Sequence, residues 1–231
     1  MKRLRNKSKK WYILTADSLL MGMILALVGG FLDAYTYITR DGVFATAQTG
    51  NTVLFAVRAA SPEFSGAIQN VWPFLAFVAG VLVAAHMKER LVRNRRVVLV
   101  VECIILFVVG LLPVNFPNMI ITMTIAFVSS MQIATFNKLG NWSYNSTITT
   151  GNLRTAAQAA YGAFFTHNTE DMSKFRSFAF IIFSFISGAL IGTFSSTYLG
   201  TTAIWIVSGI LLLTVFLYVK NHKYITPEVK P

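Results

Sequence analysis

Long runs of apolar residues are the feature that most constrains how this chain can fold. An α-helix needs ~20 apolar residues to cross ~30 Å of hydrocarbon, and six runs come near or reach that length. Hydrophobic residues make up 55% of the chain and charged residues 13%, against roughly 25% charged residues in soluble proteins. We therefore predict an all-α polytopic membrane protein surrounded by lipid bilayer, with its longest runs at residues 18–38, 71–87, 97–113, 119–136, 177–198 and 201–219.

The positive charge of the chain, a net +11, lies next to these runs. Its densest clusters fall within residues 2–10 and 88–96. Such juxtamembrane clusters are typical of cytoplasmic anchoring and of contact with anionic headgroups, so nucleic acid is not expected as a partner. His86, His167 and His222 lack metal-ligand spacing, and we expect neither a metal nor a cofactor.

Two nearly identical motifs interrupt apolar sequence: QTGN at residues 48–51 and TTGN at residues 149–152. They lie in two further apolar segments, 43–57 and 144–165. The eight segments form two sets of four, which predict a first membrane repeat at 18–113 and a second at 114–219. A basic N-terminal tail (1–17) and a C-terminal tail (220–231) flank the repeats.

Loop charges decide how many segments cross the membrane. If both Thr-Gly-Asn segments are re-entrant or broken, every Lys and Arg except Arg40 and Arg58 falls on one side. The positive-inside rule then predicts about six crossings with both termini in the cytoplasm. Each repeat contributes an odd number of crossings, so the repeats are inverted, as in many secondary transporters.

A small-residue spacing also recurs between the two sets. Gly80 and Ala84 in AGVLVA correspond to Gly188 and Gly192 in SGALIG. Small residues four apart let helices approach closely. We expect them to pack helices within the bundle, with the seam of a homodimer as the alternative.

The Thr-Gly-Asn motifs are the candidate binding site. In lipid, backbone that leaves the helix must be lined by protein or water. We interpret each motif as the start of a half-helix near the midplane, with glycine permitting the turn, Thr or Asn as N-cap, and free N–H groups suited to a polar or anionic solute. The alternative is an ordinary polar surface turn. The candidate binding residues are Gln48, Thr49, Gly50, Asn51, Thr149, Thr150, Gly151, Asn152 and Arg154.

Ionisable residues inside apolar segments are candidates for proton coupling, because buried charge is costly and usually functional. Asp33 either titrates during transport or makes a fixed hydrogen bond to the first Thr-Gly-Asn turn or to Arg40. Glu102 either lines the cavity as a second titratable group or pairs with Arg95 or Arg96. Arg154 either holds an anionic solute or reaches lipid headgroups.

The first motif and its surroundings resemble the YoaK-like family of bacterial integral membrane proteins, a domain of unknown function. The resemblance extends from about residue 18 to 218 and implies a multi-pass protein of the bacterial cytoplasmic membrane, without supplying a substrate. It rests on Gly29, Gly30, Asp33, Ala34, Phe44, Ala45, Gln48, Thr49, Gly50 and Asn51, and on the later Thr150, Gly151, Asn152 and Leu153.

These observations favour a secondary transporter for a small polar or ionic solute. A passive channel, a membrane scaffold or sensor, and an intramembrane enzyme are the alternatives. We do not expect an enzyme, because the sequence contains no nucleophile–base motif and no P-loop.

Overall fold

The structure is a computed structural model that describes residues 14–61, 65–90 and 94–225. The two tails predicted at 1–17 and 220–231 therefore lie largely outside the described residues. The described part is helical apart from connecting loops and one short hairpin. Its elements are α2 (Leu19–Thr39), α3 (Gln48–Ala59), α4 (Ser65–Ile68), α5 (Val71–Arg90), α6 (Asn94–Leu111), α7 (Asn118–Thr135), β1 (Lys138–Leu139), β2 (Trp142–Ser143), α8 (Thr149–Phe165), α9 (Thr169–Leu199), the 3₁₀ turn η2 (Gly200–Ala203) and α10 (Ile204–Ile225).

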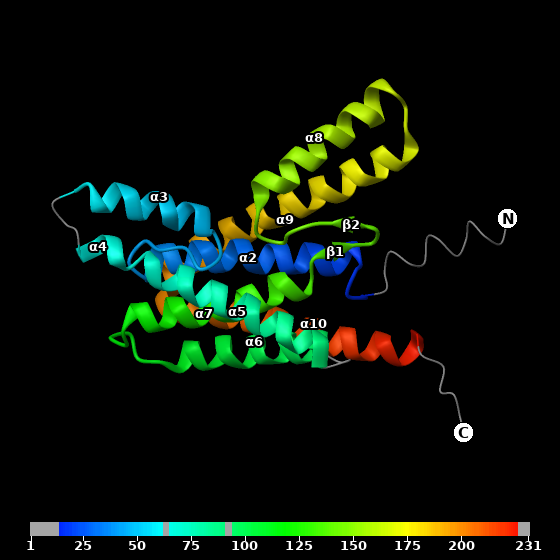
Figure 1. The fold of residues 1–231 in the computed structure, drawn as a ribbon. Coiled ribbons are helices and arrows are strands. Elements are labelled where there is room, and N and C mark those ends of the chain that lie inside the picture. The colour runs from blue at the N-terminus through cyan, green and yellow to red at the C-terminus, as the bar shows by residue number, and fades with distance from the viewer. Residues whose placement is uncertain (1–13, 62–64, 91–93, 226–231) are drawn as a thin grey trace.

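Six long helices, α2, α5, α6, α7, α9 and α10, run along one bundle (Figure 1). We call the end at which α2, α6 and α9 begin the Arg95 end, and the opposite end the Arg40 end. Four helical stretches meet the length and hydropathy needed to cross a membrane: Leu19–Thr39, Gly66–Met87, Asn118–Thr135 and Thr169–Asn221. The last of these contains both α9 and α10, because η2 reverses the chain between them. The expected apolar membrane architecture is confirmed at this level.

The helices pair between the two halves of the chain. α2 packs along α9, and α5 packs along α7. At Gly188 of α9 an added Cβ would overlap the carbonyl oxygen of Leu27, and at Gly80 of α5 it would overlap that of Phe127. Leu27 and Phe127 hold the same position in ALVGG (26–30) and AFVSS (126–130). The two small-residue sites therefore make corresponding contacts, each with a helix of the other half.

α6 and α10 form the third pair. The Ser208 hydroxyl donates to the carbonyl oxygen of Cys103 at 3.1 Å, and the Trp205 indole donates to that of Phe107 at 3.2 Å. The largest buried apolar cluster combines side chains of α2, α6, α7 and α10. The bundle is thus held by close helix approach in the α2–α9 and α5–α7 pairs and by side-chain packing in the cluster that α2, α6, α7 and α10 share.

Two helices leave the bundle. Both α3 and α8 begin near the middle of α2 and run outward toward opposite ends, α3 toward the Arg40 end and α8 toward the Arg95 end (Figure 1). α3 has 12 residues and α8 has 17, so at 1.5 Å per residue both fall short of ~30 Å.

Several boundaries differ from the sequence prediction. Residues 43–47 are apolar but form a loop, so α3 begins at Gln48. α9 begins at Thr169, well before the apolar run, because the Asn168 side chain caps a polar first turn by accepting from the N–H groups of Glu170 and Asp171. The polar stretch after α7 folds into the β1–β2 hairpin, whose turn uses Gly140 at φ +59°.

Candidate functional site

The first interrupted segment, residues 40–47, is fixed to α2 by Asp33. The Asp33 carboxylate accepts hydrogen bonds from the Thr46 N–H at 2.7 Å, the Thr46 hydroxyl at 2.7 Å and the Ala47 N–H at 3.3 Å. Asp33 is only 5% exposed. Carboxylates hydrogen-bonded to backbone N–H groups are strong acceptors. The expected hydrogen bond between Asp33 and the first break is present, and Arg40 is not its partner.

The second interrupted segment, residues 136–148, repeats this pattern with a neutral acceptor. The side-chain oxygen of Asn145 accepts from the Thr147 N–H at 2.9 Å, the Thr147 hydroxyl at 3.1 Å and the Ile148 N–H at 3.2 Å. Counted back from Thr-Gly-Asn, Thr147 and Ile148 correspond to Thr46 and Ala47. The same three donors therefore meet a carboxylate in one half and an amide in the other.

The asparagines of both motifs close their loops. The Asn51 amide donates to the carbonyl oxygen of Phe44 at 2.7 Å, and its oxygen accepts from the Phe44 N–H at 2.9 Å. The Asn152 amide donates to the carbonyl oxygen of Asn145 at 2.6 Å. Each asparagine reaches seven residues back and is buried. These contacts stabilise the loops and leave the two asparagines turned away from solvent.

The prediction that Thr or Asn of the motifs caps each helix is wrong. The N-cap residues are Ala47 and Ile148, and neither side chain makes a capping hydrogen bond. The Thr-Gly-Asn residues lie within the first turn of α3 and of α8. The N–H groups at the N-cap positions are instead bound by side chains from elsewhere. Asp33 accepts from the Ala47 N–H before α3, and Asn145 accepts from the Ile148 N–H before α8.

The motif glycines are helical, so the prediction that they permit an unusual backbone turn is also wrong. Among the described glycines, only Gly42, Gly140 and Gly200 have positive φ. Gly50 instead makes room for an aromatic ring: an added Cβ would lie 2.9 Å from Cδ2 of Phe44. At Gly151 the nearest atom would be 3.7 Å away, an ordinary contact.

The remaining candidate residues divide by exposure. Thr49, Thr150 and Arg154 are exposed, and Gln48 and Thr149 are half-buried. The Gln48 amide donates to the carbonyl oxygen of Ala45 at 2.9 Å, while its oxygen accepts from Asn51. Arg154 makes no polar contact within the described residues. Gln48 thus contributes to the first loop, whereas the side chains of Thr49, Thr150 and Arg154 make no hydrogen bond within the part of the chain that the structure describes.

Both loops dock on one face of α2. Asp33 holds Thr46 of the first loop, and Gly29, one helical turn earlier, lies against the Thr147 side chain of the second loop. Residues four apart share a helix face. The structure therefore brings the starts of α3 and α8 to neighbouring positions on α2, although no hydrogen bond joins the two motifs within the described residues.

Glu102 lies apart from these loops, inside the bundle. It is fully buried on α6, and neither carboxylate oxygen has a hydrogen-bond partner among the described residues. The prediction that it pairs with Arg95 or Arg96 is wrong: Arg95 pairs with Asp17, and Arg96 lies over the Tyr218 ring. An unpaired buried carboxylate costs several kcal/mol in its charged form.

Two residues that make central polar contacts, Arg40 and Asn145, were not selected from the sequence. Arg40, expected on the side opposite most other basic residues, is 1% exposed and donates to the Asn118 side chain and the Tyr35 hydroxyl, both at 3.0 Å. A basic residue at the end of an apolar run gives no signal that its side chain folds back over Tyr35. Asn145 was also missed, although its place two residues before Thr147 is typical of an Asx turn.

These features define a helical membrane protein in which two interrupted segments dock on a central helix. Its sequence matches, over residues 21–217, the family described as Protein of unknown function (DUF1275), and the chain belongs to this family. The resemblance to YoaK-like membrane proteins is thereby confirmed. The chain matches no curated protein and no solved structure.

Proposed function

We propose that this protein is a secondary transporter or permease for a small polar or ionic solute. The observation that carries the proposal is the pair of equivalent loops that start α3 and α8 midway along α2. Irregular backbone at such a depth is tolerated where it is enclosed by protein or lines a watery cavity. Interrupted helices that begin near the midplane are the usual binding elements of secondary transporters.

The proposed membrane topology has six crossings in two inverted repeats. The exchange of partners, α2 with α9 and α5 with α7, supports a twofold relation between the halves. The corresponding contacts of Gly188 with Leu27 and of Gly80 with Phe127 support it further. We place the Arg95 end in the cytoplasm of a bacterial cell, because most Lys and Arg residues belong to that end.

The solute binds, in this proposal, beside the first turns of α3 and α8. The exposed hydroxyls of Thr49 and Thr150 and the positive helix ends offer hydrogen-bond donors there. Arg154 adds a cation one turn into α8. The asparagines of the motifs act indirectly by holding the loops that place these groups, and Gly50 does so by leaving room for the Phe44 ring.

Asp33 couples protons to movement of α3. Ionised, it accepts three hydrogen bonds from Thr46 and Ala47. Protonation weakens its oxygens as acceptors and so releases the start of α3 from α2. Asn145 does not titrate, so the start of α8 stays fixed. Glu102, buried and unpaired, is the second proton-carrying candidate.

The test uses proteoliposomes loaded with a pH-sensitive dye and exposed to small carboxylates, amino acids and inorganic anions. We expect at least one solute to evoke saturable proton movement. Asp33→Asn should abolish the coupled flux while the protein stays folded, because Asn145 shows that an amide oxygen can hold the equivalent loop. Glu170→Gln, an exposed carboxylate on α9, is the control and should behave like the wild type.

Each other result has a definite meaning. Normal proton-coupled flux in Asp33→Asn would reject coupling through this residue. Flux that rises linearly with solute concentration would identify a passive channel. A complete lack of flux for every class of solute would contradict transport and favour a scaffold or sensor.

A further inference from the structure

A polar cavity of about 320 Å³ lies at the Arg95 end, between α5, α6 and α7. Its polar lining comes from Arg95, Thr135, Asn137 and Lys138, and alanines of α5 and α7 form much of its apolar wall. At roughly 30 Å³ per water molecule, it has room for a phosphate group with part of an attached organic substituent. Asn137 and Lys138 belong to the start of the second interrupted segment, but Thr147, which contacts the middle of α2, does not line the cavity.

The lining offers hydrogen-bond donors and positive charge. Arg95 and Lys138 are cations, and the Lys138 ammonium makes no hydrogen bond or ion pair within the described residues. The Thr135 hydroxyl is buried and has no hydrogen-bond partner among them. The Asn137 amide donates to the carbonyl oxygen of Ala134 at 3.2 Å and keeps a second N–H. Buried polar groups are normally hydrogen-bonded, so the Thr135 hydroxyl is available to bind a polar atom of a ligand in the cavity.

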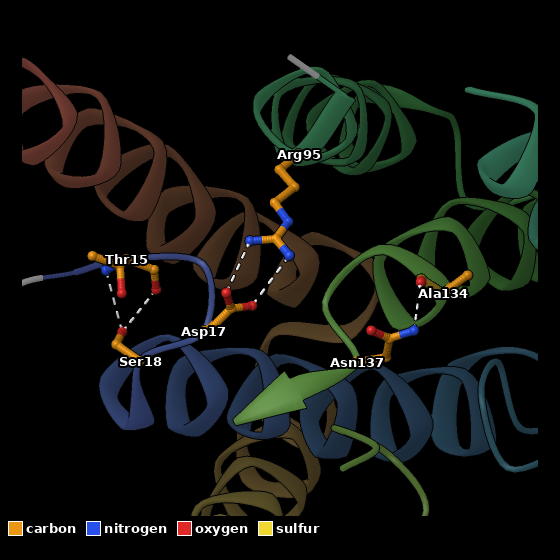
Figure 2. A network of polar contacts seen from close by, with 6 residues as sticks. All are labelled: Thr15, Asp17, Ser18, Arg95, Ala134 and Asn137. Carbon is orange, nitrogen blue, oxygen red and sulfur yellow. Dashed lines mark hydrogen bonds and ion pairs between the residues drawn. The ribbon is translucent and has the colours of Figure 1, made fainter. Parts of the chain in front are cut away.

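One carboxylate reaches this cluster from the segment before α2. Asp17 meets the Arg95 guanidinium through two contacts, at 3.2 and 3.3 Å (Figure 2). Both side chains are more than a third exposed, 37% for Arg95 and 42% for Asp17. Both distances exceed the about 2.7–2.9 Å of strong charge-assisted hydrogen bonds, and water screens an ion pair that is exposed to this degree. The Asp17 carboxylate therefore occupies the Arg95 guanidinium, and an anion with a higher negative charge can displace it.

We propose that this cavity binds a phosphate group, carried either by a lipid headgroup or by a free phosphate. The planar guanidinium of Arg95 matches phosphate oxygens in a bidentate manner. Lys138 supplies a point charge, and the Thr135 hydroxyl satisfies a third oxygen. Displacement of Asp17 accompanies binding, because its carboxylate occupies both terminal nitrogens of the guanidinium and would repel a second anion placed beside it. This site does not depend on the transport proposal.

The experiment measures binding calorimetrically on the full chain in detergent. The probes are inorganic phosphate, dihexanoyl phosphatidic acid, and dihexanoyl glycerol as the control without phosphate. We expect saturable binding of one or both phosphate probes and none of dihexanoyl glycerol. Binding of inorganic phosphate identifies a site for the free anion, whereas binding of phosphatidic acid alone identifies a lipid headgroup site.

Variants assign the binding to the cavity. Lys138→Gln should weaken it about tenfold, the loss of one charge-assisted contact. Thr135→Val should weaken it several-fold while leaving the melting temperature unchanged, because the hydroxyl has no partner to lose. Asp17→Asn should tighten it, since the competing carboxylate is removed. Lys174→Gln, a cation on α9 outside the cavity, is the matched control.

The proposal is overturned if neither phosphate probe saturates. It is also overturned if Lys174→Gln weakens binding as much as Lys138→Gln, which would mean attraction to the general charge of this end. An Asp17→Asn variant that binds phosphate more weakly would show that the ion pair holds the site together and would contradict displacement.

Discussion

Asp33 and Asn145 show how one local geometry is built from different residues. Each presents one or two oxygens to the same three donors, yet Asp33 lies on α2 and Asn145 lies within its own loop. The asparagine of each Thr-Gly-Asn motif also holds its loop, because its amide donates a hydrogen bond to a backbone carbonyl oxygen seven residues earlier. The asparagine of each motif therefore holds its loop in place, whereas the motif threonines Thr49 and Thr150 are exposed and are the groups proposed to bind a solute.

The two motif glycines should respond differently to alanine. At Gly50 the new Cβ would crowd the Phe44 ring, and such overpacking costs about 1–3 kcal/mol. At Gly151 there is space, so alanine should stabilise α8 by up to about 1 kcal/mol through its helix propensity. Thermal unfolding in detergent should show a lower melting temperature for Gly50→Ala and an equal or higher one for Gly151→Ala. Equal losses would contradict this assignment.

Glu102 should be a destabilising residue. Its buried carboxyl has no hydrogen-bond partner among the described residues. Glu102→Leu should therefore increase the free energy of unfolding by about 1 kcal/mol or more and raise the melting temperature. Glu170→Gln, an exposed change, should stay within about 0.5 kcal/mol of the wild type. A lower melting temperature in Glu102→Leu would show that the carboxyl has a stabilising partner. If Glu102 carries protons, the stable variant will also lose coupled flux.

At the scale of the helices, the sequence predicted the apolar segments well and their ends less well. Hydropathy cannot show that Val43 and Phe44 belong to a loop, because the side chains are buried or half-buried there by tertiary contacts, including the Asn51 clamp. Nor can it show the polar first turn of α9, which rests on its Asn168 cap. The two interrupted segments could be located from the sequence, but the inward turn of their asparagines required the three-dimensional structure.

Helix pairing can be tested at its closest approaches. Gly188→Ala and Gly80→Ala would each drive a methyl group into backbone or side-chain atoms of the partner helix. We expect both to lose at least about 2 kcal/mol of stability, since the helices must separate. Gly209→Ala on α10 is the control, because nothing lies within 4 Å of its added Cβ. Tolerance of Gly188→Ala and Gly80→Ala would contradict the α2–α9 and α5–α7 pairs.

For the molecule as a whole, the proposed orientation predicts which surfaces face the cell interior. Asn141, in the hairpin at the Arg95 end, and Asn115, between α6 and α7 at the Arg40 end, are both exposed. In intact cells a membrane-impermeant maleimide should label Asn115→Cys and leave Asn141→Cys unlabelled until the cells are opened. The native Cys103 is buried and should give little background. The reverse pattern would invert the orientation.

The exchange of partners between the two halves also constrains how the protein is made. α2 packs most extensively along α9, so it leaves the ribosome long before the helix that lies against Gly30 has been synthesised. During that interval Gly29 lacks the Thr147 side chain and Gly30 lacks the α9 backbone that lie against them in the finished fold. Neither half is a finished folding unit, and a chain truncated after α6 would leave α2 without its counterpart.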